Sequence, residues 1–117
     1  MKNNPNAYTS WEDITLGYKK IKPDRARQMI AEGNVTIVDV RSPDEYNTGH
    51  LKNAILLPHT QISQYSAAML PDKNADIIVH CQSGARSGAA GKELLSLGYN
   101  NIYDLGGIAR WPYELEH

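Results

Sequence analysis

Short apolar runs alternate along the chain with segments whose apolar residues recur at helical spacing. Val35–Val40 is a continuous β-branched run, typical of a strand buried on both faces. Pro23 suits the first position of a helix, and Gly33 follows its end. Strands are predicted over residues 18–21, 35–40, 54–57, 77–80 and 101–103, and helical segments over 23–32, 43–47, 60–70 and 87–97. This alternation predicts an α/β fold, with a parallel sheet covered by helices on both faces.

The two ends of the chain differ from this pattern. Residues 1–17 are polar and irregular, and we interpret them as an N-terminal arm. Leu115–His117 resembles the start of a purification tag, so we base no functional inference on it. One domain is therefore expected over residues 18–114.

Composition and charge exclude several classes of protein. Twelve Lys and Arg residues stand against 13 Asp and Glu residues, giving a formal net charge of −1. No nucleic acid or anionic membrane surface is therefore expected as a partner. No apolar run reaches the roughly 20 residues of a membrane span. The sequence favours a cytoplasmic location, although an export signal removed before Met1 would place the protein elsewhere.

The single cysteine, Cys81, follows an apolar strand and precedes a helix. One cysteine excludes both an internal disulfide and a four-cysteine zinc site. Sites in parallel sheets lie at the carboxyl ends of strands, where Cys81 is placed. A thiolate is favoured there by two sets of peptide N–H groups, those of the turn through Gly84 and those of the helix N-terminus. Arg86 adds a positive charge. We interpret Cys81 as a nucleophile, which requires a thiol that solvent can reach.

A second group of charged residues follows the strand over residues 35–40. Asp39, Arg41 and Glu45 are expected to form an ion-pair and capping network in the wall of the site. In an alternative interpretation, Arg41 reaches the pocket and helps to bind an anion. Gly106 and Gly107 are expected to shape a loop beside the site.

These segments together resemble one known family. Cys81-x-Ser83-Gly84-x-Arg86-Ser87 resembles the active-site loop of single-domain rhodanese-like sulfurtransferases. The resemblance covers roughly residues 18–114, in the order of the family's motifs. Its other parts are Val38–Arg41 with Glu45-Tyr46 and Gly49–Ala54, then Leu97–Tyr99 with Ile102-Tyr103, and Leu105–Ile108 with Trp111. It implies a three-layer fold around a mostly parallel five-stranded sheet.

The resemblance also implies a reaction. The Cys81 thiolate would take the outer sulfur of thiosulfate or a persulfide, and the persulfide would pass that sulfur to cyanide, a small thiol or a protein thiol. No metal or organic cofactor is implied. The substrate-binding residues would be those whose amides hold the persulfide sulfur and those that form the rim: Gln82, Ser83, Gly84, Ala85, Arg86 and Ser87. Many family members carry a basic residue where this chain has Gln82, which favours a persulfide or polysulfide donor over thiosulfate.

Three other interpretations stay open. Related phosphatases and arsenate reductases use Cys-x5-Arg, whereas this chain has Cys-x4-Arg with Ser87 at the arginine position. The loop could instead serve a non-enzymatic sulfur carrier or a redox sensor module. Cys81 could also be a buried structural thiol. His80 should point to the opposite face of its strand from Cys81, and His50 and His59 are interpreted as structural or surface residues.

Overall fold

The computed structural model describes residues 17–117, apart from the side chain of Arg110. Almost all of the predicted N-terminal arm, residues 1–16, lies outside the described part. Within residues 17–117, no helix is both long and apolar enough to cross a membrane.

Five parallel strands form the centre of the domain, as expected. They follow the order β1-β5-β4-β2-β3 across the sheet, and every pairing between neighbours is parallel. The strands are β1 (Tyr18–Lys20), β2 (Val35–Asp39), β3 (Ile55–Leu56), β4 (Asp76–Cys81) and β5 (Asn101–Gly107). The parallel arrangement brings their carboxyl ends to one edge of the sheet, where the candidate loop lies.

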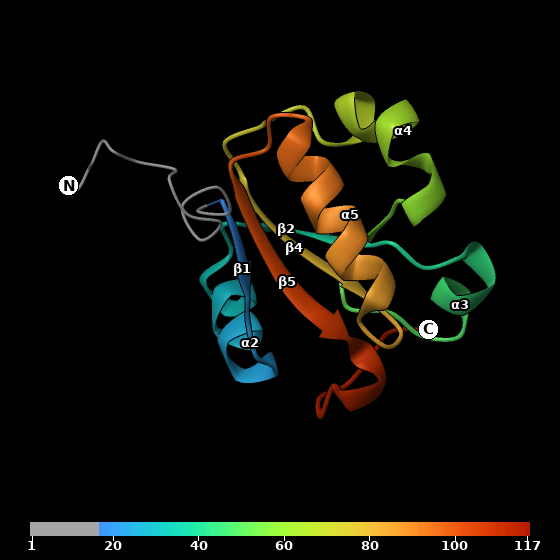
Figure 1. Ribbon diagram of the computed structural model, residues 1–117. Coiled ribbons are helices and arrows are strands. Elements are labelled where there is room, and N and C mark those ends of the chain that lie inside the picture. Colours follow the sequence, from blue (N-terminus) through green and yellow to red (C-terminus); the bar gives the residue numbers. More distant parts are fainter. Residues whose placement is uncertain (1–16) are drawn as a thin grey trace.

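Helices cover both faces of this sheet, which confirms the predicted three-layer α/β architecture. Helix α2 lies on one face, and α4 and α5 lie on the other (Figure 1). The helical segments are α2 (Pro23–Glu32), α3 (Pro43–Asn47), the 3₁₀ turn η1 (His59–Gln61), α4 (Ile62–Met69), α5 (Ala85–Ser96) and the 3₁₀ turn η2 (Ile108–Arg110). The predicted helix over residues 60–70 is thus a 3₁₀ turn followed by an α-helix.

The hydrophobic core has two parts, one on each side of the sheet. Toward α4 and α5, Val38, Val79 and Cys81 pack with residues such as Leu94. Toward α2, Ile37 and Ile78 pack with Ala26 and Met29. Alternate residues of β2 and β4 therefore enter different parts of the core, as expected for strands buried on both faces.

Strand β5 is longer than predicted, because residues 104–107 continue the strand past residue 103. The pairing of β4 with β5 shifts between Val79 and His80, so that His80 pairs with Gly106 and Cys81 with Gly107. Gly106 adopts φ +83°, a conformation that favours glycine at this irregularity. Gly106 and Gly107 are therefore strand residues beside the site, and the loop expected there is the end of β5.

The carboxyl-terminal residues contact the domain. His50 and Glu116 form an antiparallel bridge, in which each backbone N–H donates to the other residue's carbonyl, at 2.8 and 2.7 Å. Leu115 packs against the part of the core below α2.

Candidate active site

Cys81 is the last residue of β4, and only Gln82–Gly84 separate it from α5. The helix begins two residues earlier than predicted, so the loop is shorter. Gly84 adopts φ +112°, which favours glycine, and its N–H donates to Cys81 Sγ at 2.9 Å. This bond and the N-terminus of α5 both direct partial positive charge at the sulfur.

The Cys81 side chain is fully buried, with 0% of its surface exposed. The requirement for a thiol that solvent reaches is therefore not met in this structure. The side chain belongs to the core cluster toward α5. The backbone of the loop is also tightly packed: Ala109 N donates to Gln82 O at 3.2 Å, and a Cβ atom on Gly107 would lie only 2.5 Å from the same oxygen. Because the thiol is fully buried, a substrate reaches the sulfur only if the structure around it moves.

His80 does not share a site with the thiol. Cys81 packs in the part of the core below α5, whereas His80 Nε2 lies 3.8 Å from Oδ2 of Asp39. The ring is fully buried, and neither of its nitrogens has a hydrogen-bond partner. Burial lowers the pKa of His80 to about 4, against the opposing effect of Asp39, so the ring is neutral at pH 7.

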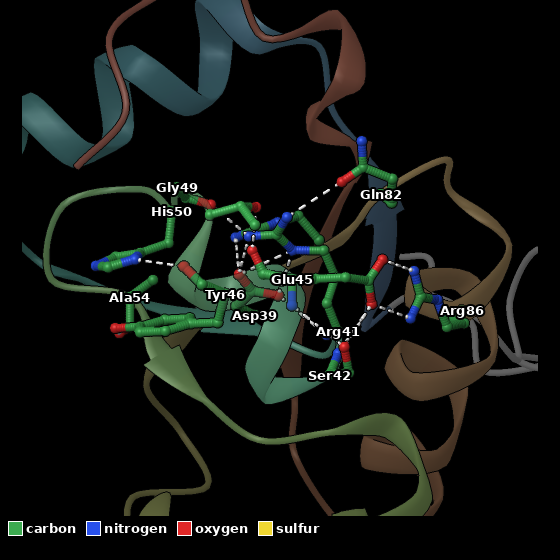
Figure 2. A network of polar contacts seen from close by, with 12 residues as sticks. Asp39, Arg41, Ser42, Glu45, Tyr46, Gly49, His50, Ala54, Gln82 and Arg86 are labelled. Atoms are coloured by element: carbon green, nitrogen blue, oxygen red, sulfur yellow. Dashed lines mark hydrogen bonds and ion pairs between the residues drawn. The ribbon is translucent and has the colours of Figure 1, made fainter. Parts of the chain in front are cut away.

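Arg41 is buried in the wall of the site and connects β2 to the loop (Figure 2). Its Nη2 donates to Asp39 Oδ2 and to Gly49 O, both at 2.7 Å. Its Nη1 donates to Gln82 Oε1 at 3.1 Å. The expected structural role fits these contacts, because Arg41 binds a carboxylate and positions the side chain that follows the cysteine.

Glu45 and Arg86 form a second ion pair, between α3 and the start of α5 (Figure 2). Nη1 and Nη2 of Arg86 donate to the two carboxylate oxygens at 2.7 and 2.8 Å. Glu45 also accepts from the backbone N–H of Ser42 in the capping box that begins α3. The Arg86 hydrogen bonds lower the pKa of Glu45 to about 2. Arg86 was expected as a positive charge at the rim; it keeps this charge, and the carboxylate of Glu45 balances it.

Two residues that the sequence analysis did not select, Asp104 and Tyr18, lie below the loop. Asp104 is buried and accepts from Ser87 Oγ at 2.7 Å, from Gly106 N at 2.8 Å, and from the Tyr18 hydroxyl. Burial and the bond to Asp104 raise the pKa of Tyr18. An aspartate within an apolar strand is a signal that could have identified this network, which fixes the first turn of α5 against β5.

The predicted loop residues lie together, whereas the other histidines do not join them. Gln82, Ser83 and Ala85 are exposed, and Ser87 is buried. His50 stacks on Tyr46, and His59 is exposed in η1. Within residues 17–117, no three His, Cys, Asp or Glu side chains are grouped as a metal site requires.

A cavity of about 460 Å³ adjoins the loop. Gln82–Gly84 form one wall, Ile21–Pro23 another, and the end of β5 with Ala109 a third. Its position at the carboxyl edge of the sheet is the usual place for ligands in this architecture.

Comparisons with known proteins agree with this geometry. Thiosulfate sulfurtransferase PspE of Escherichia coli (strain K12) is 35% identical over 71 residues, covering 61% of this chain and 68% of that protein. The solved structure of a rhodanese with anions from E. coli matches with a TM-score of 0.66 and 30% identity, over 70% of this chain and 96% of that one.

A different kind of protein contains a similar domain. The tRNA uridine(34) hydroxylase of Yersinia pestis (strain Pestoides F) is 31% identical over 107 residues, which cover 87% of this chain but 30% of that protein. The family model for the rhodanese-like domain matches residues 22–113. The chain therefore belongs to the rhodanese-like domain family.

Proposed function

We propose that this protein is a rhodanese-type sulfurtransferase that carries sulfur as a Cys81 persulfide. The Gly84 N–H bond to Cys81 Sγ at 2.9 Å, at the N-terminus of α5, is the observation that carries the proposal. Membership of the family and the similarity to PspE support sulfurtransferase activity in general.

In the first half-reaction, the Cys81 thiolate attacks the terminal sulfur of thiosulfate or of an organic persulfide. A bond forms between Sγ and that sulfur, and the sulfur–sulfur bond of the donor breaks. Sulfite or a thiolate leaves with the bonding electron pair, so no external oxidant or reductant is needed. Loop amides, that of Gly84 first, stabilise the negative charge on the new terminal sulfur.

In the second half-reaction, a nucleophile removes the terminal sulfur. Cyanide or a thiolate attacks it, the sulfur–sulfur bond breaks, and the electron pair returns to Cys81 as a thiolate. The products are thiocyanate or a new persulfide. Two half-reactions through one covalent intermediate predict ping-pong kinetics.

Charge near the loop favours a donor less charged than thiosulfate. Arg41 is paired with Asp39 and Arg86 with Glu45, so neither guanidinium presents an unbalanced charge to a dianion. Gln82 adds no charge after the cysteine. A persulfide or polysulfide is accordingly the preferred donor.

The experiment is a steady-state assay with thiosulfate, and then an organic persulfide, as donor and cyanide as acceptor. Parallel double-reciprocal plots and loss of thiocyanate formation in Cys81→Ala are expected, with a higher kcat/KM for the persulfide. The absence of turnover with every donor would contradict the proposed enzyme.

A sulfur-carrier function is the second candidate, favoured by the complete burial of Cys81. A carrier would form the persulfide but release its sulfur slowly to cyanide, and rapidly only to a partner protein's thiol. The single-turnover rate at which cyanide removes sulfur from the Cys81 persulfide separates the two functions. In the enzyme this rate is at least as fast as kcat, whereas in a carrier it is slow.

A further inference from the structure

The cavity beside the loop is far larger than thiosulfate or cyanide requires. At about 460 Å³ it falls within the range of roughly 300–1,000 Å³ typical of sites for organic ligands. The sulfur transfer proposed above uses only the loop around Cys81. The remaining volume therefore needs an explanation of its own.

The topology places this cavity where ligands bind in parallel sheets. Strand β1 leads into α2 on one face of the sheet, and β4 leads into α5 on the other (Figure 1). Strand β5 lies between β1 and β4, so the two connections diverge on either side of its carboxyl end. Ligands of open parallel sheets bind outside the carboxyl ends of the strands, which is where this cavity lies.

Gly84 lies between the cavity and the thiol. It forms part of the cavity wall, and its N–H lies 2.9 Å from Cys81 Sγ. The loop over Gln82–Gly84 is thus the partition between the two. When this loop admits a donor's sulfur to Cys81, the rest of a larger donor is directed into the cavity.

The cavity walls suit an organic group with an acidic substituent. Ile21, Pro23, Leu105 and Ala109 contribute apolar side chains. Lys22 contributes a positive charge, and none of the described lining residues carries a carboxylate. An apolar body contacting these walls is desolvated favourably, and an anionic substituent is attracted to Lys22.

We propose that this cavity binds the organic part of a sulfane-sulfur donor, with an apolar group next to the sulfur and a carboxylate near Lys22. The inference rests on the proposed function and names the substrate class of the same site. A thiosulfonate, R–SO₂–S⁻, is a suitable probe. The Cys81 thiolate bonds to its terminal sulfur, the sulfur–sulfur bond breaks, and the sulfinate R–SO₂⁻ leaves with the electron pair.

The test compares four donors: thiosulfate, methanethiosulfonate, benzenethiosulfonate and 4-carboxybenzenethiosulfonate. The rate of persulfide formation on Cys81 is followed by intact-protein mass spectrometry and divided by each donor's rate with free cysteine. We expect the benzene compound to exceed the methane compound by about tenfold, since an apolar group of this size is well discriminated by an apolar pocket. The carboxylate should add a further severalfold.

Matched variants assign these effects to the cavity. Ala109→Phe adds a bulky side chain to the cavity wall and should abolish the preference for the aromatic donors, measured as the ratio of their rates to that of methanethiosulfonate. Ala68→Phe, the same change at an exposed position of α4, should have no effect. Lys22→Gln should remove only the gain from the carboxylate, and Lys52→Gln, at a separate cavity, should not.

Equal normalised rates for methane- and benzenethiosulfonate would overturn the inference, as would an Ala109→Phe variant that slows all donors alike. In both cases, labelling by thiosulfate would leave the proposed function intact. If no donor labels Cys81, the proposed function fails first and this inference with it.

Discussion

At the scale of single residues, the two arginines beside the loop are held by carboxylates. Arg41 is buried against Asp39, and Arg86 pairs with Glu45 through both of its Nη atoms. Each guanidinium thereby fixes a wall of the site and loses much of its attraction for an anionic substrate. The proposed preference for a less charged donor thus depends on residues that are held by carboxylates in the wall of the site.

Glu45→Gln tests this control, because glutamine keeps the capping box with Ser42 and removes the ion pair with Arg86. The freed charge should accelerate persulfide formation from thiosulfate by about two- to fivefold, since exposed ion pairs contribute about 0.5–1 kcal/mol. The rate is measured by quenching the reaction at timed intervals and recording the mass of the intact protein. Asp44→Asn, an identical charge change at the neighbouring exposed residue, is the control. An equal gain in both variants would show a general charge effect instead.

The same pair predicts a contribution to stability that depends on pH. The pKa of Glu45 is lowered to about 2 from its ordinary 4.5, so its stabilising effect is complete above pH 4.5 and is lost as the pH falls toward 2. Urea denaturation of wild type and Glu45→Gln should therefore differ by no more than about 1 kcal/mol at pH 7, and the two should converge in acid. A difference that grew on acidification would contradict this assignment.

At the scale of elements, the end of β5 holds the site loop closed. The pairing of Cys81 with Gly107 brings the glycine backbone against Gln82 and Ser83, where a Cβ atom would lie 2.5 Å from Gln82 O and 2.7 Å from Ser83 Cα. The loop, the strand end and the start of α5 therefore form one tightly packed unit. Asp104 strengthens it by accepting from both Ser87 and Gly106.

Gly107→Ala should displace the loop. We expect a loss of about 1–3 kcal/mol in the free energy of unfolding, as for other overpacked sites, and persulfide formation slowed about tenfold or more. Gly33→Ala is the matched control, because Gly33 has φ +89° but no atom near its Cβ position. It should lose stability and keep the rate. A Gly107→Ala protein with wild-type kinetics would show that this contact does not position the loop.

The sequence predicted elements better than it predicted contacts. Helix α2 begins at Pro23 and ends before Gly33, as expected, and Ser42 caps α3. These signals could be read from the sequence because each acts on its own neighbours in the chain. The length of β5 was missed, since a glycine pair is also typical of loops. The pairing of Arg86 was missed because Glu45 lies 41 positions away and on another element. Burial of Cys81 likewise depends on core residues from distant parts of the chain, such as Val38 and Leu94, which no local pattern contains.

At the scale of the whole molecule, the sheet separates the Cys81 thiol from a buried titratable group. Cys81 packs toward α5, whereas His80 occupies the side of Asp39 with both ring nitrogens unpartnered. The fold therefore carries a neutral histidine in its interior at pH 7. This histidine links the stability of the domain to pH.

The linkage has a definite sign. His80 has a pKa of about 4 in the folded protein against 6.5 ordinarily, so the unfolded state takes up its proton first as the pH falls. The free energy of unfolding should decrease between pH 6.5 and 4 by up to about 3 kcal/mol. Urea denaturation across this range should show the decrease in wild type and in His59→Gln, an exposed histidine, and a smaller one in His80→Leu. An unchanged slope in His80→Leu would assign the pH dependence to other groups.

The capture of one sulfur atom by Cys81 is the central claim, and intact-protein mass spectrometry tests it most directly. After incubation with thiosulfate or an organic persulfide and removal of the donor, we predict a mass increase of one sulfur atom, absent in Cys81→Ala. Cyanide should then remove the added mass with release of thiocyanate. The test requires folded protein whose Cys81 thiol has not been oxidised. If no donor changes the mass of such protein, the account is contradicted, and Cys81 is a structural thiol of the core.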